Sequence, residues 1–581
     1  MCEVRNMLIL LKTLALWIAA CGLILLGLCV PAQIHSVDSR VLADAGQQGL
    51  SPKQTAWDAL ATANVGVAQK LCDASLNNER DRRALTQQIN ALYDTHPHYW
   101  LSGGPAPVFE PFLERIQWPL PTEHHRHAVL SALLPRANRT LLADQLAASS
   151  HRHVVHILRI RNLRGLLRLH PADHPAGAPF DSGVLTLALL MQSEAFNPSL
   201  AREIGTLAQQ AHDSQPRAVK AMEDLVIATL SIAGHMDFRS LTALAARTQN
   251  LDDWASIAAL IRADPEHITT MFSSLYHSRA PKLVYDYYAK HPTTAVADLN
   301  YALSHGPAAV QYLLETGQVR YRPPVLLKHA LRVAAPYRPQ WFVKITHHSA
   351  MGGRLLKFTL LLAGGFCFTW AMGALWRSRL QRYSQPVSRH NPAVLMRDSL
   401  LSLALVLTVW FLHEPELLKT QLGSSAGASP RIEFAVADSL QSLQTPIKAM
   451  QEINQVTLLV LILFFIIQLV IYSFCLIKLR EIEKQQLNAE LKLKLLDNED
   501  NLFDFGLYVG LGGTVLSLIM VAIGLVEASL MAAYASTLFG ILFVALLKVL
   551  HLRPYRRKLI MAAESSYSVL QPSVGHPENG N

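Results

Sequence analysis

The stretch that decides the fold is 506-GLYVGLGGTVLSLIMVAIGLVEASLMAAYASTLFGILFVALLKVL-550, which predicts two membrane helices joined by a very short turn. Each half offers roughly 20 mostly apolar residues, enough for a helix rising ~1.5 Å per residue to cross a ~30 Å hydrocarbon core. Small residues gather inside both halves, notably Gly510, Gly512, Gly513, Ala533 and Gly540. Because small side chains let helix backbones approach closely in lipid, we expect these five residues to pack the helices against protein.

Two motifs in this stretch resemble the MotA/TolQ/ExbB proton-channel family. GLGGTV (510–515) is similar to the glycine-rich start of the second of three core helices in that family, and AYASTLFGILFVALL (533–547) is similar to the Thr-x-x-Gly helix that follows. The resemblance implies that Thr514 and Thr537 line a pore. The alternative is purely structural, because a threonine in a membrane helix commonly bonds the carbonyl four residues earlier. Glu527 departs from the family pattern and is equally explained as a hydrated turn residue.

The composition indicates a membrane protein with a large soluble part. The chain has 581 residues, of which 51% are hydrophobic, and its mean hydropathy is +0.20. Its net charge of +9 comes largely from Arg and Lys beside the apolar segments, as the positive-inside bias predicts, so we infer no nucleic-acid partner. Of six cysteines only Cys72 falls in the soluble stretch, which excludes an intrachain disulfide or a cysteine-based zinc site there.

Apolar stretches and basic flanks together predict six membrane spans with both termini in the cytoplasm. Besides the hairpin, the spans are expected within 1–34 and at 355–376, 399–412 and 456–477. The span at 399–412 is short and crosses only if the charged pair before it lies at the interface. The first span is either a retained anchor or a cleaved signal sequence, and its long apolar run favours the anchor.

Residues 35–350 predict a helical exported domain. Helices of ~10 to 15 residues alternate with turn signals such as Asp264-Pro265 and Gly306-Pro307, a rhythm that favours an α-solenoid-like array. Histidine pairs one helical turn apart, His124/His127 and His153/His156, could each offer two zinc ligands. No third ligand follows from the sequence, so no metal or other cofactor is predicted, and surface histidines that respond to pH are the preferred interpretation.

Two cytoplasmic segments complete the chain. The charged segment 478–500 predicts a helix that continues from the membrane. A loose stripe along it indicates packing against neighbours: Leu479, Ile482, Ala489, Leu493 and Leu496. A solvated connector is the alternative. After the hairpin come a basic cluster and a tail rich in Ser, Pro, Gly and Asn, which we expect to be disordered.

The predicted fold class is therefore all-α, a polytopic helical membrane protein with a large exported α-solenoid-like domain. The expected divisions are a signal anchor or first span (1–34), the exported domain (35–350), the second and third spans (351–415), an outer polar loop (416–455), a three-span core with its cytoplasmic helix (456–550, including 478–500), and a basic then disordered tail (551–581).

The resemblance implies the channel-forming subunit of a proton-motive-force-driven motor or energy-transducing complex in a bacterial inner membrane, not an enzyme. It implies a closed ring of about five copies around a single-span partner that carries a membrane Asp. The exported domain would bind an envelope protein. One rival is a membrane-anchored solenoid scaffold without ion transport, and another is an exported histidine-liganded metal hydrolase.

Overall fold

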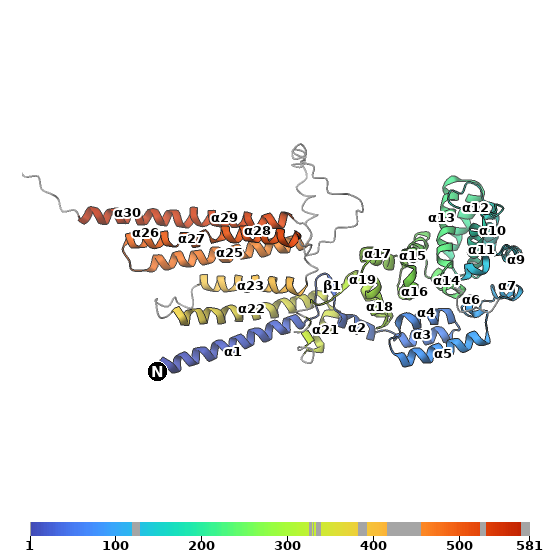
Figure 1. Ribbon diagram of the computed structural model, residues 1–581, viewed down its shortest axis with the longest axis horizontal. Helices are drawn as coiled ribbons and strands as arrows, with labels where there is room; N and C mark the ends of the chain where they lie inside the picture. Colours follow the sequence, from blue (N-terminus) through green and yellow to red (C-terminus); the bar gives the residue numbers. More distant parts are fainter. Residues whose placement is uncertain are drawn as a thin grey trace, which may run out of the picture. The chain divides into compact units, whose positions relative to one another are not determined.

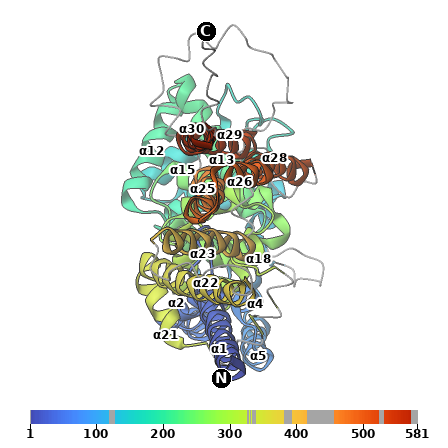
Figure 2. The same cartoon turned by 90° about the vertical axis from the view of Figure 1, so that its left-hand side faces the viewer.

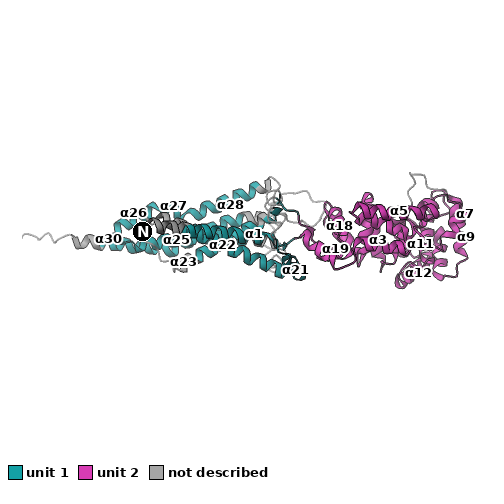
Figure 3. Ribbon diagram, turned by 90° about the horizontal axis from the view of Figure 1, so that it is seen from below, with its two compact units in different colours: residues 1–35, 322–581 teal, residues 36–321 magenta. Residues whose placement is uncertain are grey.

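The computed structural model describes residues 2–118, 128–324, 328, 331–332, 338–380, 392–414, 455–522 and 530–570. The chain divides into two compact units, residues 36–321 and residues 1–35 together with 322–581 (Figure 3). The described part is almost entirely helical, and its one sheet has two short strands. The all-α prediction is confirmed.

The unit formed by residues 1–35 and 322–581 is built on six long helices. They are α1 (Cys2–Cys29), α22 (Ala350–Leu380), α23 (Pro392–His413), α25 (Gln455–Lys484), α28 (Phe505–Ala522) and α29 (Leu530–Leu547). Packing contacts follow the order α1, α22, α23, α25, α29, α28, so the helices lie side by side (Figures 1 and 2). In Figure 1, α22, α25 and α29 run in one direction, and α1, α23 and α28 run in the other.

Four stretches in the described residues are long and apolar enough to cross a membrane: Leu11–Cys29, Ala350–Ala374, Leu461–Lys484 and Tyr534–Glu564. This supports the prediction of several membrane-spanning helices. The apolar stretch in α28, Phe505–Ile519, is shorter, and α23 begins seven residues before the predicted span at 399–412. The expected turn with Glu527 and most of the expected outer loop lie outside the described residues.

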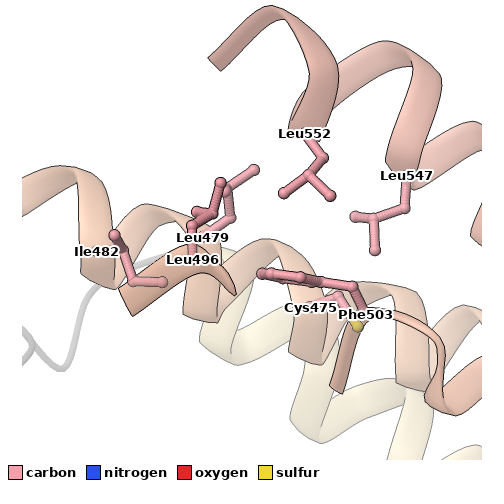
Figure 4. Close-up of a cluster of buried hydrophobic side chains, with 7 residues drawn as sticks. All are labelled: Cys475, Leu479, Ile482, Leu496, Phe503, Leu547 and Leu552. Carbon is pink, nitrogen blue, oxygen red and sulfur yellow. The ribbon is translucent and has the colours of Figure 1, made fainter. Parts of the chain in front are cut away.

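Beyond the apolar part of α25, the chain folds back and packs on itself. Two short helices, α26 (Ala489–Asn498) and α27 (Asp500–Phe503), lead into α28, while a π-helical turn (Lys548–Leu552) and α30 (Arg553–Leu570) follow α29. Buried side chains of α25, α26, α27, α29 and the π-helical turn form one cluster, shown in Figure 4: Cys475, Leu479, Ile482, Leu496, Phe503, Leu547 and Leu552. The packing interpretation of 478–500 is therefore confirmed. The helix is not continuous, however, because α25 ends at Lys484 and α26 begins at Ala489.

The segment after the hairpin is more ordered than the sequence indicated. Residues 553–570 form α30, which packs against α26, and Arg556 forms an ion pair with Asp497 on that helix. The sequence predicts a basic cluster and then a disordered tail, whereas the helix continues to Leu570. Residues 571–581 lie outside the described part of the chain.

The unit of residues 36–321 is a helical array. Its elements are β1 (Ser36–Val37), α2 (Ser39–Gln47), α3 (Pro52–Ala61), α4 (Val65–Ser75), α5 (Glu79–Thr95), α6 (Tyr99–Ser102), α7 (Glu110–Arg115), α8 (Val129–Leu133), α9 (Arg136–Ala147), α10 (Arg152–Arg159), α11 (Ala178–Gln192), α12 (Pro198–His212), α13 (Pro216–Ala233), α14 (Phe238–Ala245), α15 (Leu251–Ala263), α16 (Ile268–His277), α17 (Pro281–Lys290), α18 (Ala295–Leu303), α19 (Pro307–Thr316) and β2 (Val319–Arg320), with short 3₁₀ turns at Ile160–Asn162 and Pro265–His267.

Helices in this array pack on their next-but-one neighbours: α11 on α13, α13 on α15, and α15 on α17. Stacked helical pairs make such contacts, and the breaks fall at the predicted turn signals, as at Gly306 before α19. The array also returns on itself. Helix α4 packs on α16, α2 packs on α19, and β1 pairs in parallel with β2, contacts that an open solenoid lacks.

The boundary of this unit differs from the predicted 35–350. Residues 322–350 group instead with the long apolar helices. Helix α21 (Gln340–His348) packs against α22, and its Phe342 joins a buried cluster with Cys29 and Val30 at the end of α1. The burial of these apolar side chains explains why 322–350 belongs to the other unit.

Candidate functional site

Helices α28 and α29 approach each other most closely at glycines. A Cβ atom at Gly510 would lie 2.9 Å from the carbonyl oxygen of Ser536 and 3.3 Å from the Cα atom of Gly540. A Cβ atom at Gly540 would lie 2.7 Å from the carbonyl oxygen of Gly506. Any side chain would force the backbones apart, so glycine is what permits this contact.

The two other glycines of the first motif differ in environment. A Cβ atom at Gly513 would clash with the hydroxyl oxygen of Ser536, whereas one at Gly512 would meet no heavy atom of another described element within 4 Å. Within a single chain, Gly513 therefore faces α29 and Gly512 faces open space. Ala533 is part of α29, but its side chain lies outside the described part of the chain.

Thr514 and Thr537 meet across the same interface. Their hydroxyl oxygens are within hydrogen-bonding distance of each other. Thr514 Oγ1 also donates to the carbonyl oxygen of Gly510 at 3.1 Å, and Thr537 Oγ1 lies 3.4 Å from the same oxygen. Two hydroxyl protons cannot fill these three contacts at once, so the pair can form more than one hydrogen-bonding arrangement.

Gln468 on α25 is a third polar residue at this junction, and sequence reasoning missed it. Its side chain is 1% exposed, and Nε2 donates to the carbonyl oxygen of Gly506 at 3.1 Å. Its amide oxygen has no hydrogen-bond partner among the described residues. The available signal was an amide inside the most apolar predicted span, 456–477, where polar side chains are rare and costly.

These groups form one continuous feature, which we call the polar seam: Gln468, Thr514, Ser536 and Thr537. Gln468 contacts Gly506, and the threonine pair contacts Gly510, one helical turn further along α28. Helices α25, α28 and α29 contain no Asp, Glu, Lys or Arg in their described parts, apart from the charged residues at their ends. Charge begins at the ends, where Lys548 and Asp504 form an ion pair of 2.7 Å.

The histidine pairs do not form a metal centre in the part of the chain that the structure describes. No group of three or more His, Cys, Asp or Glu side chains able to hold a metal occurs there. The ring of His153 packs closely on Gly205, and burial together with nearby His and Arg side chains lowers the pKa of His153. His124 and His127 lie outside the described residues.

Comparison of the chain with protein-family models, with curated proteins and with solved structures finds no match. Function is therefore inferred from the polar seam and from the arrangement of the long helices.

Proposed function

We propose that this chain is the ion-conducting subunit of a proton-motive-force-driven motor or energy-transducing complex in a bacterial inner membrane. Helices α25, α28 and α29 line the ion path. Thr514 and Thr537 supply hydroxyl groups to it. The observation that carries this proposal is the polar seam, because two threonines and an amide lie within one helical turn of each other inside apolar helices.

Hydroxyl and amide groups can hydrate or hydrogen-bond a passing proton, but they do not hold one near neutral pH. A carboxylate must therefore come from a separate chain, which we assign to a single-span partner with a membrane Asp. A ring of about five copies of this chain would surround the partner, in keeping with the closed symmetry of most homo-oligomers. The amide oxygen of Gln468 has no partner among the described residues, which supports the presence of a further donor, such as a water molecule, because an unmade buried hydrogen bond costs roughly 1 to 3 kcal/mol.

The orientation follows from the basic residues at the helix ends. Lys478 and Arg480 lie toward the end of α25, and Lys548 follows α29, which runs in the same direction. By the positive-inside bias, this end is cytoplasmic, as are both termini. Residues 36–321 are then exported, where they bind an envelope protein or the object that is moved.

A scaffold without ion transport is the second candidate, and one observation favours it. Thr514 donates to the carbonyl four residues earlier, the usual structural bond of a membrane threonine, and the glycines serve helix packing. On this alternative the hydroxyl groups only hold α28 against α29.

The two functions are distinguished by proton flux. The complex is purified gently from native membranes, its copy number and partner are read by native mass spectrometry, and it is reconstituted in vesicles with a pH-sensitive dye inside. We expect Thr514→Val and Thr537→Val to keep the assembly but reduce flux by roughly tenfold, the effect of ~1.4 kcal/mol on the barrier. Thr408→Val is the matched control, because Thr408 is an exposed threonine on α23 that bonds its own helix at Ala404 and lies outside the proposed path. Full flux in both valine variants, or no flux in the intact complex, would support the scaffold.

A further inference from the structure

A second group of buried polar side chains lies where α1 ends and α22 begins, away from the polar seam. Lys357 on α22 is 0% exposed, and its Nζ atom donates to the carbonyl oxygen of Ala32 at 2.9 Å. The same Nζ atom lies 3.3 Å from Nδ1 of His413, the last residue of α23, and 5.1 Å from the ring centroid of Trp410. His413 is 1% exposed.

Two neighbouring side chains hold the backbone that follows Ala32. Glu414, 1% exposed, accepts hydrogen bonds from the backbone N–H groups of Ile34 at 2.9 Å and His35 at 2.8 Å. Arg354 donates to the carbonyl oxygens of Gln33 at 3.2 Å and Ile34 at 3.4 Å. Together these residues, Arg354, Lys357, His413 and Glu414, form what we call the clasp, and they bind every residue of the segment 32–35.

The clasp was not predicted from the sequence. Lys357 lies inside the predicted apolar span 355–376, and His413 and Glu414 come just after the end of the span predicted at 399–412. A buried charge at a membrane helix is costly and is kept where it has a specific partner. The proposed ion path uses none of these residues.

The contact between Lys357 and His413 depends on the protonation of the imidazole. An ammonium group has three donors and no acceptor, so it can bond Nδ1 of His413 only while that nitrogen carries no proton. A proton taken up from solvent at Nδ1 would turn the acceptor into a donor and would place two positive charges 3.3 Å apart in a buried site. An imidazole is the side chain that changes charge in this way near neutral pH.

We propose that Lys357 and His413 form a proton-binding site that controls the hold of the clasp on residues 32–35. With His413 neutral, Lys357 bonds both the imidazole and Ala32, and the segment is held. With His413 protonated, the ammonium is repelled, the carbonyl of Ala32 loses its donor, and the segment loosens. The site thus binds a proton near the end of α1 as the pH falls. Proton binding increases the mobility of residues 32–35, which follow this helix.

The other charged groups at the site set the sign of the effect. Arg354 adds a positive charge, and the ring of His35, whose Nε2 atom is buried, can add another. Glu414 is the negative group, and its oxygens are occupied by the N–H groups of Ile34 and His35. Among the described residues, a proton on His413 therefore joins the cations Lys357 and Arg354, with Glu414 as the carboxylate, so acid is expected to loosen the clasp.

Hydrogen exchange on the full-length protein in nanodiscs tests this site, with protection factors that correct for the intrinsic effect of pH. Between pH 8 and pH 5.5 we expect protection at Ile34 and His35 to fall by about tenfold, the change in population that ~1.4 kcal/mol represents. His413→Gln keeps an acceptor for Lys357 but cannot titrate, so its protection should remain high at both pH values. His348→Gln, an exposed histidine on α21, is the matched control and should behave as the parent.

Three results would overturn the proposal. The first is protection at Ile34 and His35 that does not change with pH in the parent protein. This measurement does not depend on whether any variant folds. The second is either of two results for His413→Gln. A pH dependence like that of the parent would show that His413 is not the group that binds the proton, and loss of protection at both pH values would show that the imidazole only packs. The third is loss of the pH dependence in the His35→Gln variant while the His413→Gln variant keeps it, which would show that His35 binds the proton.

Discussion

The hydroxyl groups of Thr514 and Thr537 lie within hydrogen-bonding distance of each other across the interface of α28 and α29. Because they share partners, their contributions to stability should not add. Thr514→Val and Thr537→Val, made singly and together, are expected to show a coupling of about 0.5 to 1 kcal/mol in the free energy of unfolding, the usual size for such bonds in membranes. Denaturant titration in mixed micelles measures it.

The control for this cycle is Thr408, which donates to its own helix at Ala404 and is exposed. The pair Thr514→Val and Thr408→Val should show no coupling, because distant residues without common partners behave additively. Zero coupling between Thr514 and Thr537 as well would contradict the hydrogen bond between them.

The glycines of the same interface should differ sharply in their tolerance of a methyl group. Gly510→Ala and Gly540→Ala force contact with backbone atoms at 2.9 Å and 2.7 Å, so each is expected to destabilise the protein by ~1 to 3 kcal/mol. Gly512→Ala meets no atom of another described element within 4 Å and should be neutral in isolated subunits. Unfolding of the monodisperse subunit in detergent checks all three, and equal costs for Gly510→Ala and Gly512→Ala would contradict this packing.

The buried cluster beyond the membrane helices makes a separate prediction. Leu496→Ala removes a 3% exposed side chain from the contact of α26 with α25 and α30, and should cost ~2 to 5 kcal/mol. Leu487→Ala, in the break between α25 and α26, removes a 40% exposed side chain and should cost far less. Proteolysis of the segment 478–500 in the intact protein gives a local readout. Similar cleavage rates in the two variants would contradict a stabilising role for this cluster.

Hydrophobic patterns were sufficient for the coarse fold. The apolar runs placed the long helices, and Pro and Gly signals placed breaks such as the one before α19, because these residues restrict the backbone locally. Of the five residues in the predicted stripe, Leu479, Ile482 and Leu496 lie in the buried cluster, whereas Ala489 and Leu493 are only partly buried. Contacts between residues that are far apart in the sequence were not predicted. Nothing local in 322–350 shows that Phe342 packs against the end of α1, so the domain boundary was placed too late.

The candidate site was also only partly predicted from the sequence. The motifs located Thr514, Thr537 and their glycines, since small and hydroxylated residues stand out in an apolar run. Gln468 and Lys357 were missed because the role of a single polar residue in a long apolar stretch depends on the residue it contacts. Gln468 contacts Gly506, and Lys357 contacts His413. Those partners are distant in sequence, and only the packing of the helices brings them together.

The contacts of α1 predict that this helix is retained. A Cβ atom at Gly364 of α22 would lie 2.8 Å from the side chain of Ile24, and one at Gly27 would lie 2.9 Å from that of Leu361. The bond at a possible cleavage site after Ala32 is buried, since Ala32 is 2% exposed. The intact mass of protein isolated from membranes should therefore include residues 1–32, and a mass beginning at Gln33 would refute the retained anchor.

His277 on α16 predicts a pH dependence in the unit of residues 36–321. Burial and the nearby guanidinium of Arg247 lower the pKa of His277 from 6.5 to about 4. The unfolded chain then binds a proton at a higher pH than the folded one, so the stabilising contribution is complete above pH 6.5 and is lost as the pH falls toward 4. His277→Gln should flatten this slope. Hydrogen exchange of α16 in the full-length protein under mild denaturant measures it, with exposed His267→Gln as the control. A slope in His277→Gln equal to that of the parent would show that other groups set the acid sensitivity of this unit.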